Sequence, residues 1–284
     1  MSWQGWLDHG MESQFNPRVA VGDAAAVCLA AWADQSEVRK AELTGRFDLA
    51  YGPHHLMRYD FHPGHKDRPI IINFHGGYWR ALDKADFSYV CEPLVDAGAI
   101  VASVNYGLCP AVTVEAIVEQ TREATAWLYR NAADLGGDPT KLHLSGHSAG
   151  AHLAVMMMAT DWKAFGSDLP ADPIKSVTAI SGVYDLDPIP HLSTNADIRL
   201  DAAMARNLSP MFMTPVVDVP LSVIVGLGEL DEFVRQSKEF AADWSSKLSN
   251  VEYTELPGLN HFTIVDTMDR ADDPITARMI DYMV

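Results

Sequence analysis

Residues 142–160, LHLSGHSAGAHLAVMMMAT, place Ser148 between two glycines directly after a short apolar run. Leu142 and Leu144 alternate with polar residues as they do in a strand, and the small and apolar residues from Ala149 onward are typical of a helix. A sharp turn between such a strand and helix exposes the serine hydroxyl at the carboxyl edge of the sheet. The stretch therefore predicts a nucleophile at Ser148, and it argues against a serine that only packs in a glycine-rich turn.

Apolar, β-branched runs and helix-period segments alternate along the rest of the chain. The runs that predict strands are 69–74, 99–104, 141–145, 174–181, 219–225 and 251–256. The segments that predict helices are 85–97, 113–135, 149–160, 232–248 and 272–283. This alternation predicts a mostly parallel central sheet with helices on both faces, and residues 46–61 predict antiparallel strands at its edge.

The chain has 284 residues, of which 48% are apolar, and no Pro/Gly-rich linker divides it. We therefore expect a single domain over residues 1–284, with a helical segment over about residues 1–45. Residues 186–216 interrupt the alternation with short helical pieces and four prolines, which is more than a simple crossover requires. This insertion is a candidate lid.

The formal net charge of −17 is spread along the chain, so nucleic acid and anionic membranes are not expected as partners. Residues 1–15 lack the basic start and apolar run of a signal peptide, and no apolar stretch is long enough to span a membrane. The three cysteines lie far apart, which favours buried, reduced thiols over a disulfide framework. These features predict a cytoplasmic protein that acts on a small molecule.

A serine hydroxyl needs a base to take its proton and an acid to orient that base. In α/β-hydrolases these residues follow the chain order serine, then aspartate or glutamate, then histidine. Of the eleven histidines, only His261 lies after residue 191, in the loop that leaves the last predicted strand. His261 is therefore the predicted base.

The acid has two candidates after the strand at 219–225, Glu229 and Asp231. Gly226 precedes Glu229 at the spacing with which the acid usually leaves the sheet edge. Aspartate is the more usual residue type, however, and Asp231 has the same spacing from a second glycine. Glu229 is the predicted acid and Asp231 the alternative. Two more distant alternatives follow the preceding strand, Asp185 and Asp187.

The hydrolysis of an acyl compound also needs N–H donors for the oxyanion of its tetrahedral intermediate. The segment NFHGGYWR at 73–80 follows a predicted strand and carries two adjacent glycines, Gly76 and Gly77. Glycines can turn their amides toward a substrate because they lack Cβ. Together with the amide of Ala149, directly after the nucleophile, they are the predicted oxyanion hole.

The motifs HGGYW at 75–79 and GHSAG at 146–150 resemble those of the α/β-hydrolase arylformamidases, also called kynurenine formamidases, and their bacterial relatives. The resemblance covers most of the chain. Further matching segments are ESQFNPRVAV at 12–21, YDFHP at 59–63, VNYGLCP at 104–110, EFVRQSKEF at 232–240 and GLNHFTI at 258–264. The resemblance implies an α/β-hydrolase fold, catalytic roles for Ser148, Glu229 and His261, an oxyanion loop at Gly76 and Gly77, and no metal or organic cofactor.

This resemblance implies hydrolysis of an N-formyl arylamine through an acyl-enzyme, with N-formylkynurenine as the family's substrate. The formyl group needs little acyl space, but the aromatic ring needs a flat pocket. Aromatic residues near the predicted strand ends are candidates to line that pocket, although each also suits a packed core. These candidates are Tyr78, Trp79, Tyr106 and Tyr184.

Two other classes of function are weighed against this one. The first is a carboxylesterase or amidase that uses the same residues on another small neutral ester, amide or carbamate. The second is a non-catalytic α/β-hydrolase fold, which should have lost a catalytic residue or the oxyanion glycines, and here none is missing. A zinc site is not expected, because His54, His55, His62 and His65 have no acids at a recognisable zinc spacing. The natural substrate and the oligomeric state, a homodimer included, stay open.

Overall fold

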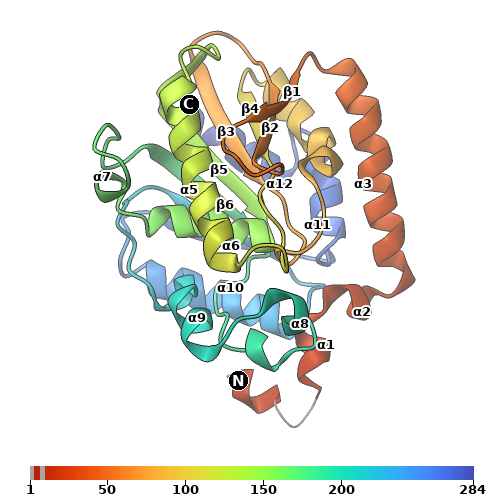
Figure 1. The fold of residues 1–284 in the computed structure, drawn as a ribbon. Coiled ribbons are helices and arrows are strands. Elements are labelled where there is room, and N and C mark those ends of the chain that lie inside the picture. The colour runs from red at the N-terminus through yellow and green to blue at the C-terminus, as the bar shows by residue number, and fades with distance from the viewer. Residues whose placement is uncertain (1–2, 7–9) are drawn as a thin grey trace.

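The computed structural model describes residues 3–6 and 10–284, and its centre is an eight-stranded sheet (Figure 1). The strand order is β1-β2-β4-β3-β5-β6-β7-β8. Pairing is antiparallel from β1 to β2 and from β2 to β4, and parallel between all other neighbours. The strands are β1 (Arg46–Ala50), β2 (Arg58–His62), β3 (Arg68–Phe74), β4 (Ile100–Val104), β5 (Gly137–His147), β6 (Ile174–Ile180), β7 (Leu221–Gly226) and β8 (Val251–Leu256). The predicted fold class is confirmed.

Helices cover both faces of the sheet, and alternate residues of β3 show how. Ile70 and Ile72 point to a core shared with α5, α6 and α10, whereas Ile71 points to a second core shared with α3, α4, α11 and α12. This division follows from the two-residue period of a strand. The bounds are α3 (Asp23–Glu42), α4 (Glu92–Asp96), α5 (Val114–Asn131), α6 (Ala149–Met158), α7 (Trp162–Phe165), α10 (Asp231–Trp244), α11 (Thr263–Asp266) and α12 (Pro274–Asp281).

The helix predicted at 85–97 is the element that differs most from expectation. The structure has a 3-10 helix, η2 (Lys84–Cys91), followed by the short helix α4, with a non-helical residue at Phe87. Pro93 stands in the first turn of α4, where its missing N–H costs no helical hydrogen bond. The prediction of one continuous helix here is wrong because the apolar period extends across a break in the backbone.

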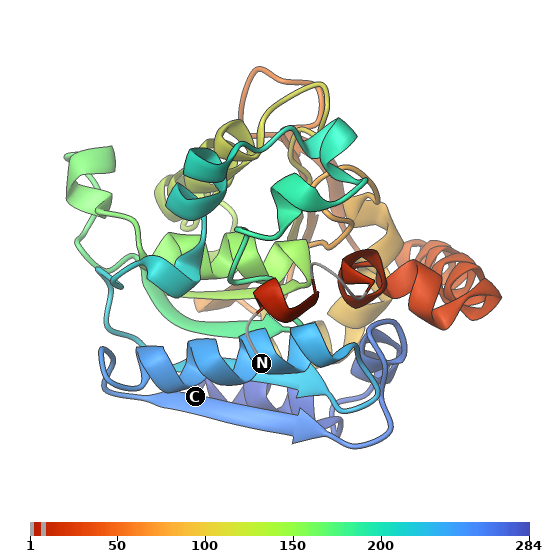
Figure 2. The same ribbon diagram turned by 90° about the horizontal axis from the view of Figure 1, so that it is seen from below.

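The N-terminal segment and the insertion lie together at the carboxyl ends of the strands. Figure 2 shows the first helices, in red, between the teal insertion and the blue helix α10. The carboxylate of Glu12 accepts hydrogen bonds from the backbone N–H and the hydroxyl of Ser193. The N-terminal elements are η1 (Trp3–Trp6), α1 (Met11–Phe15) and α2 (Pro17–Val21). The elements of the insertion are η3 (Ile189–His191), α8 (Asn195–Ile198), α9 (Ala202–Asn207) and η4 (Pro210–Phe212).

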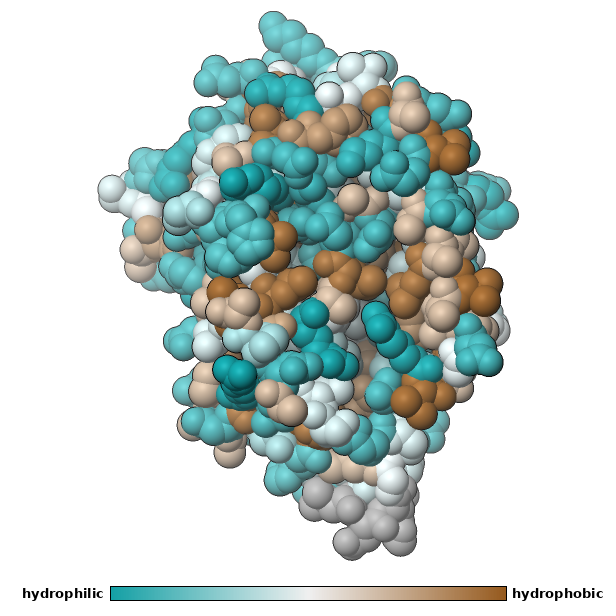
Figure 3. All heavy atoms as spheres, turned by 45° about the vertical axis from the view of Figure 1, so that its right-hand side comes forward, coloured by the Kyte–Doolittle hydropathy of each residue, from teal (hydrophilic) through white to brown (hydrophobic). Residues whose placement is uncertain are grey.

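Helix α3 packs one narrow stripe against the sheet and leaves the rest of its surface in solvent. Trp32 is only 1% exposed, whereas Val27 and Val38 are 68% and 57% exposed. The side of the molecule that comes forward in Figure 3 accordingly shows apolar side chains between hydrophilic ones. Within residues 3–6 and 10–284, no helix combines the length and the apolar character needed to cross a membrane.

Candidate active site

Ser148 stands on the sharp turn between β5 and α6, with φ 58° and ψ −119°. The turn is anchored to the neighbouring strand, since the N–H of Ser148 donates to the carbonyl of Ile180 at 2.8 Å. Its two flanking glycines are sterically required. A Cβ on Gly146 would collide with the carbonyl of Gly150, and one on Gly150 would collide with that of Phe74. Packing at this turn therefore holds the serine in a strained conformation.

His261 lies beside this serine, in the loop after β8. Its Nε2 is 3.0 Å from the Oγ of Ser148, and both side chains are buried. The other ring nitrogen, Nδ1, is 2.7 Å from a carboxylate oxygen of Glu229. Because the carboxylate can only accept, Nδ1 carries the proton, and Nε2 is free to accept the proton of the serine.

Glu229 is held by more than the histidine. Its Oε2 binds His261, and its Oε1 accepts hydrogen bonds from the hydroxyl of Ser181 at 2.5 Å and from the N–H of Gly226 at 2.9 Å. The side chain is fully buried. The three donors hold both oxygens of the carboxylate in place. The structure thus joins Glu229, His261 and Ser148 in one series of hydrogen bonds.

The other candidate acids point elsewhere. Asp231 is the exposed first residue of α10. Asp185 accepts a hydrogen bond from the N–H of Asp187 at 3.0 Å, and Asp187 forms an ion pair with Arg206 at 3.1 Å. None of these three carboxylates contacts the histidine among the interactions of the described residues. Glu229 is therefore the acid that the geometry favours.

The glycine loop after β3 approaches the serine closely. An ideal Cβ on Gly76 would lie 3.3 Å from the Cβ of Ser148. The next three residues, Gly77, Tyr78 and Trp79, all have positive φ values, of 107°, 56° and 57°. Within the described part of the chain, no acceptor receives a hydrogen bond from the amide of Gly76, Gly77 or Ala149. These free amides beside the nucleophile suit the stabilisation of an oxyanion.

Two side chains of this loop fasten it to the rest of the protein. The hydroxyl of Tyr78 donates to the carbonyl of Phe15 at 2.9 Å. The indole N–H of Trp79 donates to Nδ1 of His152 at 3.2 Å, and Nε2 of His152 in turn donates to the carbonyl of Leu208 at 2.8 Å. Burial lowers the pKa of His152 to about 4, so the ring is neutral and can accept at one nitrogen while it donates at the other. The oxyanion loop is thus tied to α1 and to the insertion.

Gly77→Ala is expected to lower kcat by about 100-fold, the loss typical of one oxyanion-hole donor. The added Cβ would collide with the carbonyl of Ala81, so the loop must shift and its amide turns away from the substrate. Gly136→Ala is the matched control, because Gly136 also has a positive φ, of 87°, but has open space around a Cβ. The control should lose some thermal stability and keep its kcat. An unchanged kcat in Gly77→Ala would assign the loop another role.

A pocket of about 170 Å³ opens beside the serine and the histidine. The N-terminal helices α1, α2 and α3 form much of its wall, whereas the insertion contributes only Thr194. Four of the lining residues are Phe, Tyr or Trp, a residue type that suits contact with an aromatic substrate. They are Phe15, Trp32, Tyr78 and Phe262.

Three of the four aromatic residues predicted to contact substrate belong to the core instead. Trp79, Tyr106 and Tyr184 are all 0% exposed and do not line the pocket. Tyr106 stacks on His75, and Tyr184 stacks on Phe240. The prediction is wrong for these three because aromatic residues at strand ends pack under the covering helices. Of the four, only Tyr78 lines the pocket.

Sequence reasoning missed two groups of residues at the site. Ser181, which binds the acid, follows β6 at a positive φ of 51°, and its sequence context carries no recognisable signal. The pocket-lining residues of the N-terminal helices are the second group. For this group the sequence did offer a signal, since the segment ESQFNPRVAV at 12–21 resembles the arylformamidases. Its residue pattern did not indicate that these residues line the pocket.

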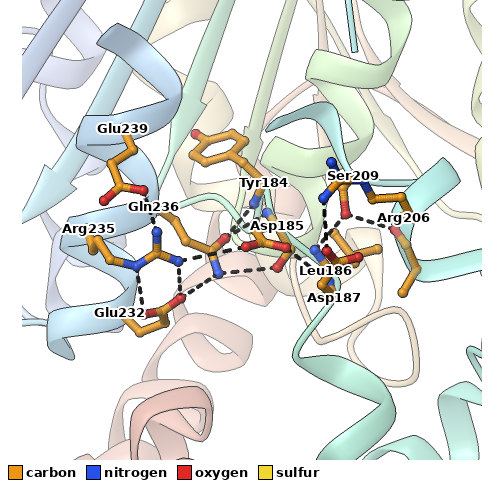
Figure 4. A network of polar contacts seen from close by, with 11 residues as sticks. Tyr184, Asp185, Leu186, Asp187, Arg206, Ser209, Glu232, Arg235, Gln236 and Glu239 are labelled. Atoms are coloured by element: carbon orange, nitrogen blue, oxygen red, sulfur yellow. Dashed lines mark hydrogen bonds and ion pairs between the residues drawn. The ribbon is translucent and has the colours of Figure 1, made fainter. Parts of the chain in front are cut away.

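A polar network joins the base of the insertion to α10 (Figure 4). The amide oxygen of Gln236 accepts from the backbone N–H groups of Tyr184 and Asp185 at 2.8 and 2.9 Å. Arg235 pairs with the buried Glu232 at 2.5 Å and lies 3.8 Å from Asp185. Burial is the main reason that the pKa of Asp185 is raised to about 6.

The raised pKa of Asp185 should make the free energy of unfolding depend on pH. Because its pKa is higher in the folded than in the unfolded protein, its contribution is fully present below about pH 4 and is lost as the pH rises through about 6. We expect the free energy of unfolding of the wild type, relative to Asp185→Asn, to fall by about 1–3 kcal/mol between pH 4 and pH 7. Urea denaturation of both proteins at each pH measures this difference. A constant difference would contradict the expectation.

The described residues contain no group of three or more His, Cys, Asp or Glu side chains that could hold a metal ion. His54 and His55 lie against each other, with ring centroids 4.4 Å apart, and His62 is buried separately. Cys28, Cys91 and Cys109 are free.

Comparison with known proteins identifies the family of this chain. A family model described as BD-FAE matches residues 59–242, from β2 to α10. The kynurenine formamidase of Danio rerio is 28% identical over 264 residues, which cover 90% of this chain and 88% of that protein. For the kynurenine formamidase of Salmo salar the identity is 27% over 295 residues, with coverage of 99% and 98%. The crystal structure of a putative thioesterase from a Silicibacter species has a TM-score of 0.80 at 28% identity and covers 90% of this chain and 93% of that one. The chain belongs to the BD-FAE family and is an arylformamidase-like member of the α/β-hydrolase superfamily.

Proposed function

We propose that this hydrolase cleaves the formyl amide of N-formyl arylamines through a formyl-enzyme on Ser148. The observation that carries the proposal is the series of hydrogen bonds from Glu229 through His261 to Ser148, beside free amides and a ring-walled pocket. The kynurenine formamidases to which the chain is similar support the choice of an aryl formamide as the substrate.

In the first half of the reaction, Oγ of Ser148 attacks the formyl carbon while Nε2 of His261 takes the hydroxyl proton. The carbonyl oxygen becomes an oxyanion, to which the amides of Gly76, Gly77 and Ala149 donate. The intermediate then collapses, the C–N bond breaks, and His261 gives its proton to the departing arylamine. Glu229 stabilises the imidazolium and keeps the ring in one orientation. The products are a formyl ester of Ser148 and a neutral amine.

In the second half, water attacks the formyl ester while His261 takes one of its protons. The ester bond breaks, the histidine returns the proton to Oγ of Ser148, and formate leaves. No further co-reactant is needed, since the overall reaction consumes one water and releases one neutral amine and one formic acid, which ionises to formate and a proton.

The runner-up is a carboxylesterase or amidase for another small substrate, for which the similar putative thioesterase offers support. Formanilide, acetanilide and phenyl acetate separate the two functions, because they vary the acyl group and the leaving atom one at a time. The quantity to compare is kcat/KM divided by the rate of the uncatalysed hydrolysis. We expect this enhancement to be largest for formanilide. A larger value for phenyl acetate would favour the esterase.

A non-catalytic role is tested separately. A sulfonyl fluoride should label the protein at one equivalent, and peptide mapping should place the label on Ser148. Absence of labelling in a folded sample would support a binding protein and would remove the proposed mechanism.

We also propose that the protein acts in the cytoplasm. The three free thiols of the described structure support a reducing compartment. Fractionation of the native host followed by formamidase assay tests this location.

A further inference from the structure

The oxyanion loop has a backbone conformation that its residues would not adopt on their own. Tyr78 and Trp79 follow one another, and both have φ values in the left-handed region, 56° and 57°, which favours glycine. Such a conformation persists only where surrounding contacts hold it. The contacts of these residues therefore decide where the amides of Gly76 and Gly77 point.

The side chain of Trp79 makes one of these contacts in the protein interior. Its ring meets the ring of His152 edge-on, with centroids 5.1 Å apart and planes at 88°. An indole N–H can only donate, so Nδ1 of His152 is the acceptor of the 3.2 Å hydrogen bond between them. Because both side chains are 0% exposed, bulk water does not replace this bond when it is lost.

His152 has a fixed position relative to the nucleophile. It lies one turn into α6, the helix that begins directly after Ser148. Its backbone N–H donates to the carbonyl of Ser148 at 3.2 Å. A tryptophan bound to this histidine is therefore held at a set distance from the serine, and the oxyanion loop is held with it.

The insertion determines which nitrogen of His152 carries the proton. The carbonyl of Leu208, directly after α9, can only accept, so Nε2 is the donor of the 2.8 Å hydrogen bond to it. In the neutral ring this leaves a lone pair on Nδ1, which is the acceptor that the indole of Trp79 requires. The insertion supplies only Thr194 to the pocket, yet it acts on the oxyanion loop through this ring.

We propose that His152 is a positioning residue through which the insertion, residues 186–216, holds the oxyanion loop in register with the nucleophile. The inference rests on the oxyanion hole of the proposed function, but it does not depend on whether the scissile bond is an amide or an ester. His152 does not line the pocket, so its effect on the rate passes through the amides of the loop. The insertion then has a role at the site that does not require it to close as a lid.

Trp79→Phe is the mildest test, because it removes the indole N–H and keeps an aromatic ring. We expect kcat on formanilide to fall about tenfold and KM to stay within about twofold, since an oxyanion hole acts on the transition state. The matched control is Trp162→Phe. Trp162, on α7, is also 0% exposed and donates its indole N–H to a backbone carbonyl, that of Met157, at 3.1 Å. This control should keep its kcat.

Two replacements of His152 test the ring itself. His152→Leu removes both hydrogen bonds and should lower kcat at least as much as Trp79→Phe. His152→Gln should recover most of the rate, because its amide oxygen can accept from Trp79 while its NH₂ group donates to Leu208. The matched control is His143→Leu, since His143 is a buried histidine on β5 whose Nδ1 lies 2.8 Å from the hydroxyl of Ser176. Melting temperatures verify folding, and Trp79→Phe carries the test if His152→Leu does not fold.

A sulfur-containing substrate separates a displaced oxyanion hole from general damage to the enzyme. Sulfur accepts hydrogen bonds more weakly than oxygen, so an intact hole favours formanilide over thioformanilide. We expect the ratio of their kcat/KM values to fall about tenfold in Trp79→Phe and His152→Leu and to stay unchanged in both controls. A loss of folded protein would lower the two rates equally and leave this ratio as it is.

Hydrogen exchange tests the part played by the insertion. Exchange of the amides in residues 75–82 should become faster in both Trp79→Phe and His152→Leu. Exchange in residues 202–209 should become faster only in His152→Leu, because Trp79→Phe leaves the bond to Leu208 in place. Unchanged exchange of residues 202–209 in His152→Leu would overturn the link to the insertion.

A wild-type kcat in Trp79→Phe, or an unchanged ratio of the oxygen and sulfur substrates, overturns the role of His152. Phenyl acetate and its thiono ester give the same ratio if formanilide is not hydrolysed, so the inference and the proposed function can fail separately. Turnover of formanilide that the variants do not affect would retain the formamidase and reject the positioning role. A ratio that falls in the variants of an enzyme active only on esters would do the reverse.

Discussion

Ser148→Ala is expected to lower kcat by about 10⁴- to 10⁶-fold, because the nucleophile, base and acid act as a unit. The fold should survive the change. Alanine keeps the Cβ at the turn, where φ is 58°, and the N–H that donates to Ile180 is unaffected. Turnover of formanilide, together with the melting temperature, measures both effects.

The matched control is Ser145→Ala, three residues earlier on β5. Ser145 is also buried, but its hydroxyl has no hydrogen-bond partner among the described residues. Replacement of Ser145 should therefore leave kcat within about twofold of the wild-type value, because the lost hydroxyl takes part neither in a hydrogen bond nor in the reaction. If Ser148→Ala kept more than a tenth of the wild-type rate, another residue would have to be the nucleophile.

Glu229→Gln is expected to lower kcat by about 10³- to 10⁴-fold. The amide fills the same space but does not stabilise the imidazolium, and its NH₂ group can turn toward Nδ1 and favour the wrong tautomer of His261. The hydrogen bonds of the carboxylate with Ser181 and Gly226 would also weaken. Stopped-flow or steady-state assay of formanilide hydrolysis measures the loss.

Asp231→Asn is the matched comparison, because Asp231 is the nearest acid along the chain and is exposed at the start of α10. It should keep most of the wild-type rate. The kcat of Ser181→Ala is expected to lie between the kcat values of Glu229→Gln and Asp231→Asn, because Ser181 only positions the carboxylate of Glu229. The reverse ranking of Glu229→Gln and Asp231→Asn would transfer the role to Asp231, and full activity in both would point to Asp185.

Much of the architecture could be predicted because its signals are local. Buried parallel strands are continuous apolar runs, and amphipathic helices repeat every 3.6 residues, so β3, β6 and α5 were visible in the sequence near their observed bounds. The turn at Ser148 was equally readable, since only glycine fits at positions 146 and 150. The break between η2 and α4 was not, because the apolar pattern continues through it.

The choice among the acids shows where local signals end. Glu229 and Asp231 have the same spacing from a glycine, and residue type favoured the aspartate. In the structure, Glu229 faces inward to Ser181 and His261, whereas Asp231 begins a helix and points to solvent. A hydrogen bond between residues 32 positions apart depends on how two loops pack, which no local pattern encodes.

The sequence by itself determined the class of fold, the elbow, and the chain order of serine, acid and histidine, because each depends on neighbouring residues and their steric limits. Only the tertiary structure decided which aromatic rings line the pocket and which are core, and that helices from the first 32 residues form much of its wall. The physical reason is that a pocket is the space left between elements distant in sequence. Its lining therefore depends on how those elements pack against one another, and the periodicity of any single element does not reveal it.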